Sequence, residues 1–187
     1  MTAATASVAG PAGTHVHVVG AGAVADAVTR SLSTCSGIAA APAVVVVPRV
    51  PEPGALAELS ARHLDTEVAE PLTDVLLAVQ QALPGLRAAG GGRLVFVLPV
   101  GPVMGEPSAS ASAAVVGGVL SMARTLAIEL GRDGVTVNVV VVDPLRLDEL
   151  GPALADQFAA LLGRGGAGLT GQEIYVTGGV ELGRLRP

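Results

Sequence analysis

The chain has no lysine, and it has only one cysteine and three aromatic side chains in 187 residues. The single cysteine, Cys35, excludes a disulfide framework within the chain and favours a reducing cytoplasm. Cys35 can be a reactive thiol, but we favour a small apolar packing residue. A net charge of -5 without basic runs argues against nucleic-acid binding, and so few aromatic rings leave no stacking surface for single strands.

The N-terminal segment is small and polar, without a basic start or a long apolar core. We therefore predict a flexible lead-in over residues 1–13 rather than a signal peptide, followed by a single domain over residues 14–187. No uncharged apolar stretch reaches the roughly 20 residues of a membrane helix without Pro or Gly breaks, so we expect no membrane span.

Valine, alanine, leucine and glycine dominate, and half of all residues are hydrophobic. This mixture is typical of buried parallel strands covered by small-residue helices. Apolar β-branched runs alternate with helical patterns, which predicts an α/β, Rossmann-like doubly wound parallel sheet. We expect about five strands, with the strand at 15–19 at an edge. The predicted strands are 15–19, 43–48, 93–98, 135–142 and 172–177, and the predicted helices are 24–32, 55–67, 71–86, 108–130 and 151–162.

The first predicted strand ends in Gly20-x-Gly22-x-x-Ala25, the loosest form of the dinucleotide-binding fingerprint. In that fingerprint, glycines let the backbone approach a pyrophosphate at the N-terminus of a helix. In a chain so rich in Ala and Gly, a tight strand-to-helix turn is the favoured interpretation. Asp26 would also place a negative charge near a phosphate.

Several segments, in the right order, resemble the short-chain dehydrogenase/reductase family over about residues 68 to 180. They correspond to two of the family's helices, its fifth and sixth strands and its C-terminal signature. They are 71–84, 91–97, 112–130, 134–140 and 169–179. The resemblance implies hydride chemistry by a tetrad of Asn, Ser, Tyr and Lys.

The four tetrad positions carry other residues in this chain. Carried over by position, the family's Asn is Pro71, its Ser falls near Leu98 or Pro99, its Tyr is Ser108 and its Lys is Ser112. A serine hydroxyl is far too weak an acid to replace a lysine-activated phenol near neutral pH. We therefore expect no reductase chemistry from these positions.

The interval between Gly22 and Val44 is too short for the strands that hold the adenosine half of the cofactor in the family. We therefore expect no NAD(P) cofactor, and Gly20, Gly22 and Ala25 are at most a vestige of its site.

Other candidate sites have a chemical and a structural interpretation. Asp143 follows a strand at the edge where doubly wound folds bind ligands, but we favour a turn cap before Pro144. His15 and His17 share one strand face, yet further metal ligands are missing from the pattern, so we expect no metal. Ser108 and Ser112 can bond a ligand one helical turn apart, although small-residue packing is favoured.

The resemblance also implies assembly, because the helices over 71–87 and 108–130 correspond to the family's dimer interface. We predict a non-catalytic subunit that assembles with a complete, active reductase of the family, or otherwise a homodimer, in the cytoplasm. One alternative is a redox-independent cyclase or isomerase in the vacated pocket. A further alternative is an unorthodox NAD(P)-dependent oxidoreductase.

Overall fold

The computed structural model describes residues 5–9, 15–38 and 41–179 of the chain. Its centre is a six-stranded sheet in which the strands follow one another in sequence order. Strands β2 to β6 run parallel, and β1 runs antiparallel to β2 at the edge. The strands are β1 (Thr5–Ala9), β2 (His15–Val19), β3 (Ala43–Val46), β4 (Gly92–Pro99), β5 (Val135–Val142) and β6 (Glu173–Val176).

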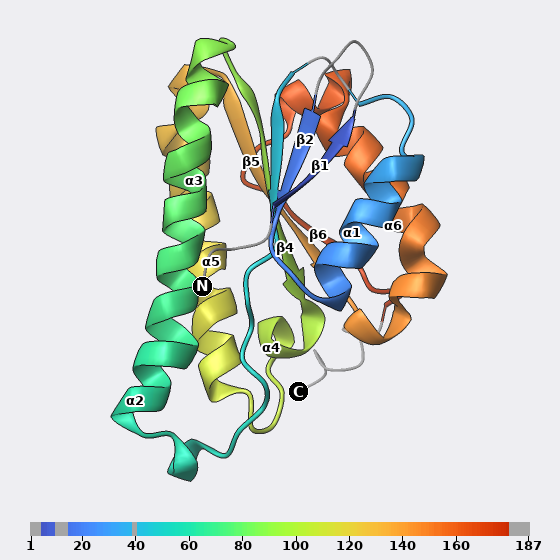
Figure 1. Cartoon of the computed structure of the whole chain (residues 1–187). Helices are drawn as coiled ribbons and strands as arrows, with labels where there is room; N and C mark the ends of the chain where they lie inside the picture. The colour runs from blue at the N-terminus through green and yellow to red at the C-terminus, as the bar shows by residue number, and fades with distance from the viewer. Residues whose placement is uncertain (1–4, 10–14, 39–40, 180–187) are drawn as a thin grey trace.

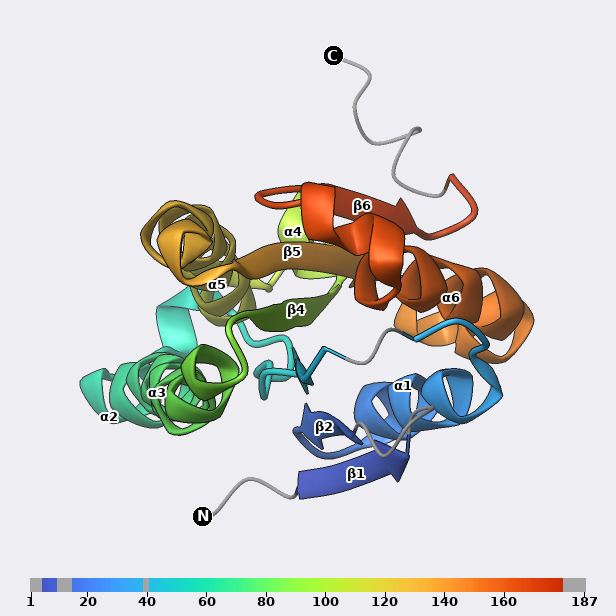
Figure 2. The same ribbon diagram turned by 90° about the horizontal axis from the view of Figure 1, so that it is seen from above.

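Helices cover both faces of the sheet (Figure 2). Helices α3 and α5 lie on one face, and α1 and α6 lie on the other, which confirms the predicted doubly wound class. The short α2 leads into α3, and the short α4 follows β4 directly. The helices are α1 (Ala23–Thr34), α2 (Ala61–Leu64), α3 (Glu70–Ala88), α4 (Val100–Met104), α5 (Ser110–Glu129) and α6 (Leu147–Leu162).

The core consists of two apolar layers separated by the sheet. Every residue of β5 is buried, as expected for a central parallel strand covered on both faces. Side chains along each strand point alternately into the two layers, and Phe96 of β4 lies in the layer under α3 and α5. Phe158 of α6 lies in the other layer. The valine runs therefore fill most of both layers, with one phenylalanine ring in each.

Three expectations about the elements were wrong. Residues 5–9 form β1 instead of belonging to a flexible lead-in, so the sheet has six strands and β2 is not at its edge. The rest of that predicted lead-in, residues 1–4 and 10–13, lies outside the described residues. The helix expected over 55–67 is instead a 3-10 turn over Leu56–Glu58, then α2 and a π-helical segment over Asp65–Ala69 that continues into α3.

The connection from β2 through α1 to β3 is left-handed (Figure 1). The connections through α1, α3, α5 and α6 all step in the same direction along the sheet. Because α1 and α6 lie on the face opposite α3 and α5, the two pairs of connections have opposite hands. Parallel crossovers are right-handed in about 98% of cases, so the β2–α1–β3 and β5–α6–β6 units, which share this hand, are both exceptional.

By length and composition alone, α5 is the one helix among the described residues that can cross a membrane. Core helices of soluble proteins meet the same criterion, and α5 packs along β4 and β5. Seven of its residues are buried, including Val115, Val116 and Val119. The apolar character of α5 is therefore accounted for in part by the core it covers.

Candidate functional site

The carboxyl edge of the parallel strands is where doubly wound folds bind ligands. Here Pro99 ends β4 and serves as the N-cap residue of α4, so no loop separates the strand from the helix. Val100 is buried, and Val103 and Met104 pack against the core below α5. The chain itself therefore fills the space at the end of β4.

Ser108 lies in a turn just before α5 and is exposed. Its φ of 62° is the only positive value among the described non-glycine residues. The amide of Ala109 donates to the Glu106 carbonyl across this turn (3.2 Å), and the amide of Gly54 donates to the Ser108 carbonyl (2.7 Å). The backbone at Ser108 thus ties the loop after β3 to the start of α5.

Ser112 and Pro71 are both buried in helices. The Ser112 hydroxyl is 2% exposed and donates to the Ala109 carbonyl (3.0 Å), within its own helical turn. Pro71 is the second residue of α3, and its side chain has no polar atom. Ser112 therefore packs as expected from its small size, and it does not share a site with the exposed Ser108.

Asp143 caps a turn, as its structural interpretation predicts. Its carboxylate accepts from the amide of Leu145 (3.0 Å), and its carbonyl accepts from the amide of Arg146 (3.1 Å). The Arg146 guanidinium donates to both carboxylate oxygens of Glu149 (2.6 and 3.0 Å) and to the Thr177 carbonyl (3.0 Å). The hydrogen bonds and charge of Arg146 lower the pKa of Glu149. This network fixes the end of β5 to the end of β6.

Gly20 and Gly22 form the turn between β2 and α1. A Cβ atom at Gly20 would lie 2.5 Å from the Val47 carbonyl oxygen, so the glycine is required for packing against the end of β3. Gly22 has a φ of 89° and nothing within 4 Å of its Cβ position, and Ala25 is buried in the core. The fingerprint glycines are therefore explained by chain packing and turn geometry.

The side of β2 opposite β3 is the place where dinucleotide-binding folds put their second strand, near the residue that binds the ribose. Here β1 occupies that side and runs in the opposite direction, with Thr5 paired to Val19. The described residues between α1 and β3 form no strand. The residues present do not fit the adenosine half of NAD(P).

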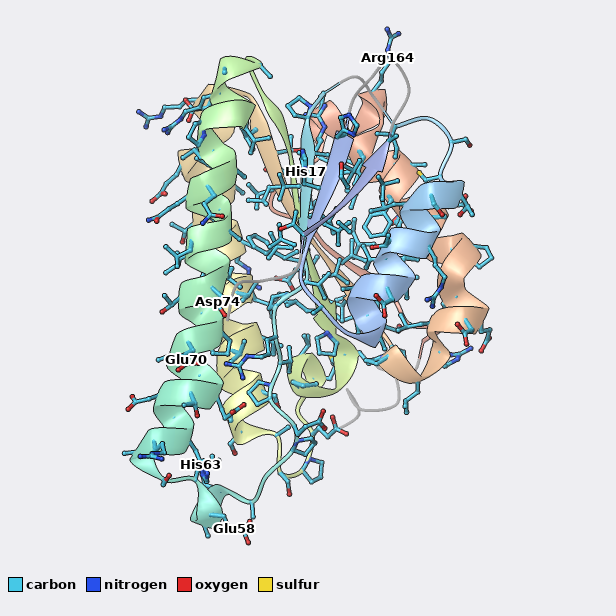
Figure 3. The ribbon with its side chains drawn as sticks, viewed as in Figure 1. His17, Glu58, His63, Glu70, Asp74 and Arg164 are labelled. Carbon is cyan, nitrogen blue, oxygen red and sulfur yellow. The ribbon has the colours of Figure 1, made fainter. Side chains whose placement is uncertain are left out.

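His15 and His17 are exposed on one face of β2, with their ring centroids 6.3 Å apart. The Ser7 hydroxyl lies 3.3 Å from Nδ1 of His15 and joins β1 to β2 through side chains. Figure 3 shows His17 on the sheet, well away from His63 at the other end of the molecule. Within the described residues, no three His, Cys, Asp or Glu side chains form a group that can hold a metal ion.

Cys35 follows α1 and is half-buried beside α6. Its thiol lies 3.5 Å from the Ala155 carbonyl oxygen, and burial, followed by the charge of Asp156, raises the pKa of the thiol. A hollow of about 540 Å³ lies between α1 and α6 nearby, lined by Arg30, Ser31 and Asp156 among others. A raised pKa fits a packing cysteine better than a nucleophile.

Arg49 is an ion-pairing residue that the sequence did not single out. It follows β3 and donates to the Thr66 carbonyl (2.6 Å) in the π-helical segment. It also pairs with Glu67 (3.2 Å) and Glu70 (3.6 Å). No local pattern signals this contact, because the partners lie 17 to 21 residues further along the chain.

The family model described as Enoyl-(Acyl carrier protein) reductase matches residues 2–156. The chain belongs to the short-chain dehydrogenase/reductase family. Solved structures agree in fold: an oxidoreductase of this family from Burkholderia thailandensis superposes with a TM-score of 0.63 at 24% identity, over 73% of this chain and 63% of that chain.

Two curated relatives of the chain are bacterial proteins of redox metabolism. The (2S)-[(R)-hydroxy(phenyl)methyl]succinyl-CoA dehydrogenase subunit BbsC of Thauera aromatica is 43% identical over 79 residues, which are 42% of this chain and 30% of BbsC. The 1-cyclohexenylcarbonyl-CoA reductase of Streptomyces collinus is 28% identical over 153 residues, covering 68% of this chain and 54% of the reductase. The chain thus spans about a third to a half of these relatives.

Proposed function

We propose that this chain is a non-catalytic subunit that assembles with a complete short-chain dehydrogenase/reductase. The single observation that carries the proposal is the state of the four tetrad positions. Two are prolines, one is a buried serine bonded within its own helix, and one is an exposed serine in a turn. None of these side chains supplies a general acid near neutral pH or an amine that can lower the pKa of one.

The proposal includes the absence of NAD(P) binding. The glycines of the β2–α1 turn have packing roles, and β1 lies where the strand of the adenosine site would be. α4 and the loop tied to Ser108 fill the end of the sheet over β4. Together these features support a cleft that holds no nicotinamide cofactor.

The proposed assembly face is formed by the outer sides of α3 and α5. Leu76 and Leu77 of α3 are each 46% exposed, and Ile128 of α5 is 81% exposed. The exposed side of α5 also carries small residues, such as Gly117 and Ser121, which allow another helix to approach closely. Large exposed apolar side chains beside a small-residue stripe favour burial against a partner.

BbsC supports the subunit role, since its name describes one subunit of a dehydrogenase. By analogy, the partner of this chain is a complete family member that supplies the tetrad and the cofactor. We place the complex in the cytoplasm, in line with the single half-buried cysteine.

The test is co-expression of the tagged chain with complete family members encoded in the same genome, followed by native mass spectrometry. We expect one of them to co-purify in a fixed ratio. Leu77→Asp should abolish this complex, because it places a charge in the apolar face. Leu145→Asp is the matched control, since Leu145 is 94% exposed beside α6 and lies outside the proposed face.

Two results would overturn the proposal. One is the failure of every complete family member from the same genome to co-purify with the tagged chain. The other is fluorescence titration showing that the isolated chain binds NADH or NADPH, together with reductase turnover.

A further inference from the structure

We infer that β1 is a docking edge for β1 of a second copy of this chain, joining two sheets across a twofold axis. β1 is the outermost strand of the described sheet, and its outer side pairs with no strand there. The inference concerns a different surface from the helical face proposed above and does not depend on it.

The edge lacks the features with which proteins usually protect such strands. Its five residues, Thr-Ala-Ser-Val-Ala, contain no charged side chain and no proline, and the strand pairs with β2 without a bulge. Isolated edges are normally protected by lysine, proline or bulges, because their free amides and carbonyls invite another strand. In this sheet the opposite edge strand, β6, carries Glu173 in an ion pair with Arg124.

The sequence of β1 is compatible with antiparallel pairing to itself. With Ser7 on the twofold axis, Ser7 lies opposite its copy, Ala6 lies opposite Val8, and Thr5 lies opposite Ala9. Side chains alternate along a strand, so Ala6 and Val8 share one face of the joined sheet. Val8 already packs against the core layer under α1, so this face is the apolar one.

A second copy fits this edge because an uncharged strand meets no like charge when it pairs with itself. The edge also lies apart from the proposed helical face: α3 contacts β3 and β4, and α5 contacts β4 and β5. Figure 2 shows β1 at one end of the sheet, beyond β2, with α5 beside the strands near the other end. Two copies paired through β1 can therefore each hold a partner on α3 and α5.

Disulfide trapping tests the pairing in the isolated chain. The background is Cys35→Ala, which removes the native thiol. Ser7→Cys should form an intermolecular disulfide under mild oxidation, because directly opposed residues bring their Cα atoms within the range of about 4.4–6.8 Å that a disulfide spans. The matched control is His17→Cys on the exposed neighbouring position of β2, paired with Ser7 in register.

In the paired dimer, two copies of position 17 are three strand spacings apart, about 14 Å, and cannot be bridged. We expect Ser7→Cys to cross-link at least tenfold faster than His17→Cys. Equal rates for the two variants would overturn the inference.

Charge provides a second, independent readout. Ser7→Lys should shift the chain from dimer to monomer in native mass spectrometry, whereas His17→Lys should leave the dimer intact. Circular dichroism of both variants verifies the fold. A wild-type chain that is monomeric at 100 µM, about the upper range of such an assay, would also overturn the inference. Because no partner protein is present, these outcomes are separate from those that test the subunit role.

Discussion

Two polar side chains on the same strand and face are predicted to respond to substitution with opposite signs. Asn138 of β5 is 1% exposed; its amide donates to the Leu169 carbonyl (2.8 Å), and its oxygen accepts from the Gln172 amide (3.1 Å). Thr136, two residues earlier, is 7% exposed, and its hydroxyl has no hydrogen-bond partner among the described residues. The first side chain joins β5 to the segment before β6, and the second makes no such link.

The magnitudes follow from these contacts. Asn138→Ala removes two hydrogen bonds worth about 1 kcal/mol each and leaves a small cavity. We therefore expect the free energy of unfolding to fall by about 2–4 kcal/mol. Thr136→Val keeps the side-chain shape and removes a buried hydroxyl without a partner among the described residues. We therefore expect the free energy of unfolding to rise by about 1 kcal/mol.

Urea denaturation followed by circular dichroism measures both changes, provided that the slope of the transition is unchanged. The reasoning is refuted if Thr136→Val destabilises the protein by as much as Asn138→Ala. That outcome would mean that burial on this strand, rather than hydrogen bonding, decides the cost.

Three further predictions concern single sites. Burial, followed by the charge of Asp156, raises the pKa of Cys35, so less thiolate is present at pH 7.5. Iodoacetamide should therefore react more slowly with Cys35 than with the cysteine of an unstructured peptide. Asp156→Asn should speed the reaction only slightly, because burial is the larger cause. Arg49→Ala should lower the free energy of unfolding by about 0.5–1.5 kcal/mol through the lost bond to the π-helical segment, and high salt should reduce the difference in urea melts. Ser108→Tyr combined with Ser112→Lys should yield no NAD(P)H oxidation with ketone substrates, whereas measurable turnover would contradict the proposed loss of the cofactor site.

The buried elements were predictable from the sequence because their patterns are strong. The valine runs of β3 and β5 and the long apolar α5 lie within a few residues of their predicted bounds. Asp143 caps the turn that its neighbour Pro144 suggested.

The elements that were missed depend on contacts distant in sequence. β1 is small, uncharged and only weakly apolar, and it becomes a strand because the edge of β2 offers it hydrogen-bonding partners. Separate helices were expected over 55–67 and 71–86, with the second beginning at Pro71, since a proline has no amide to bond the carbonyl four residues earlier. The chain instead remains helical through the π turns over Asp65–Ala69, where Arg49 bonds a backbone carbonyl.

The measurement that tests the central claim most directly is native mass spectrometry of the tagged chain, purified from its own host at endogenous levels. The account predicts a complex of fixed stoichiometry with a second family member that carries the full Asn, Ser, Tyr and Lys tetrad. A chain that is isolated without such a partner, and that oxidises NADH or NADPH by itself, would contradict the account.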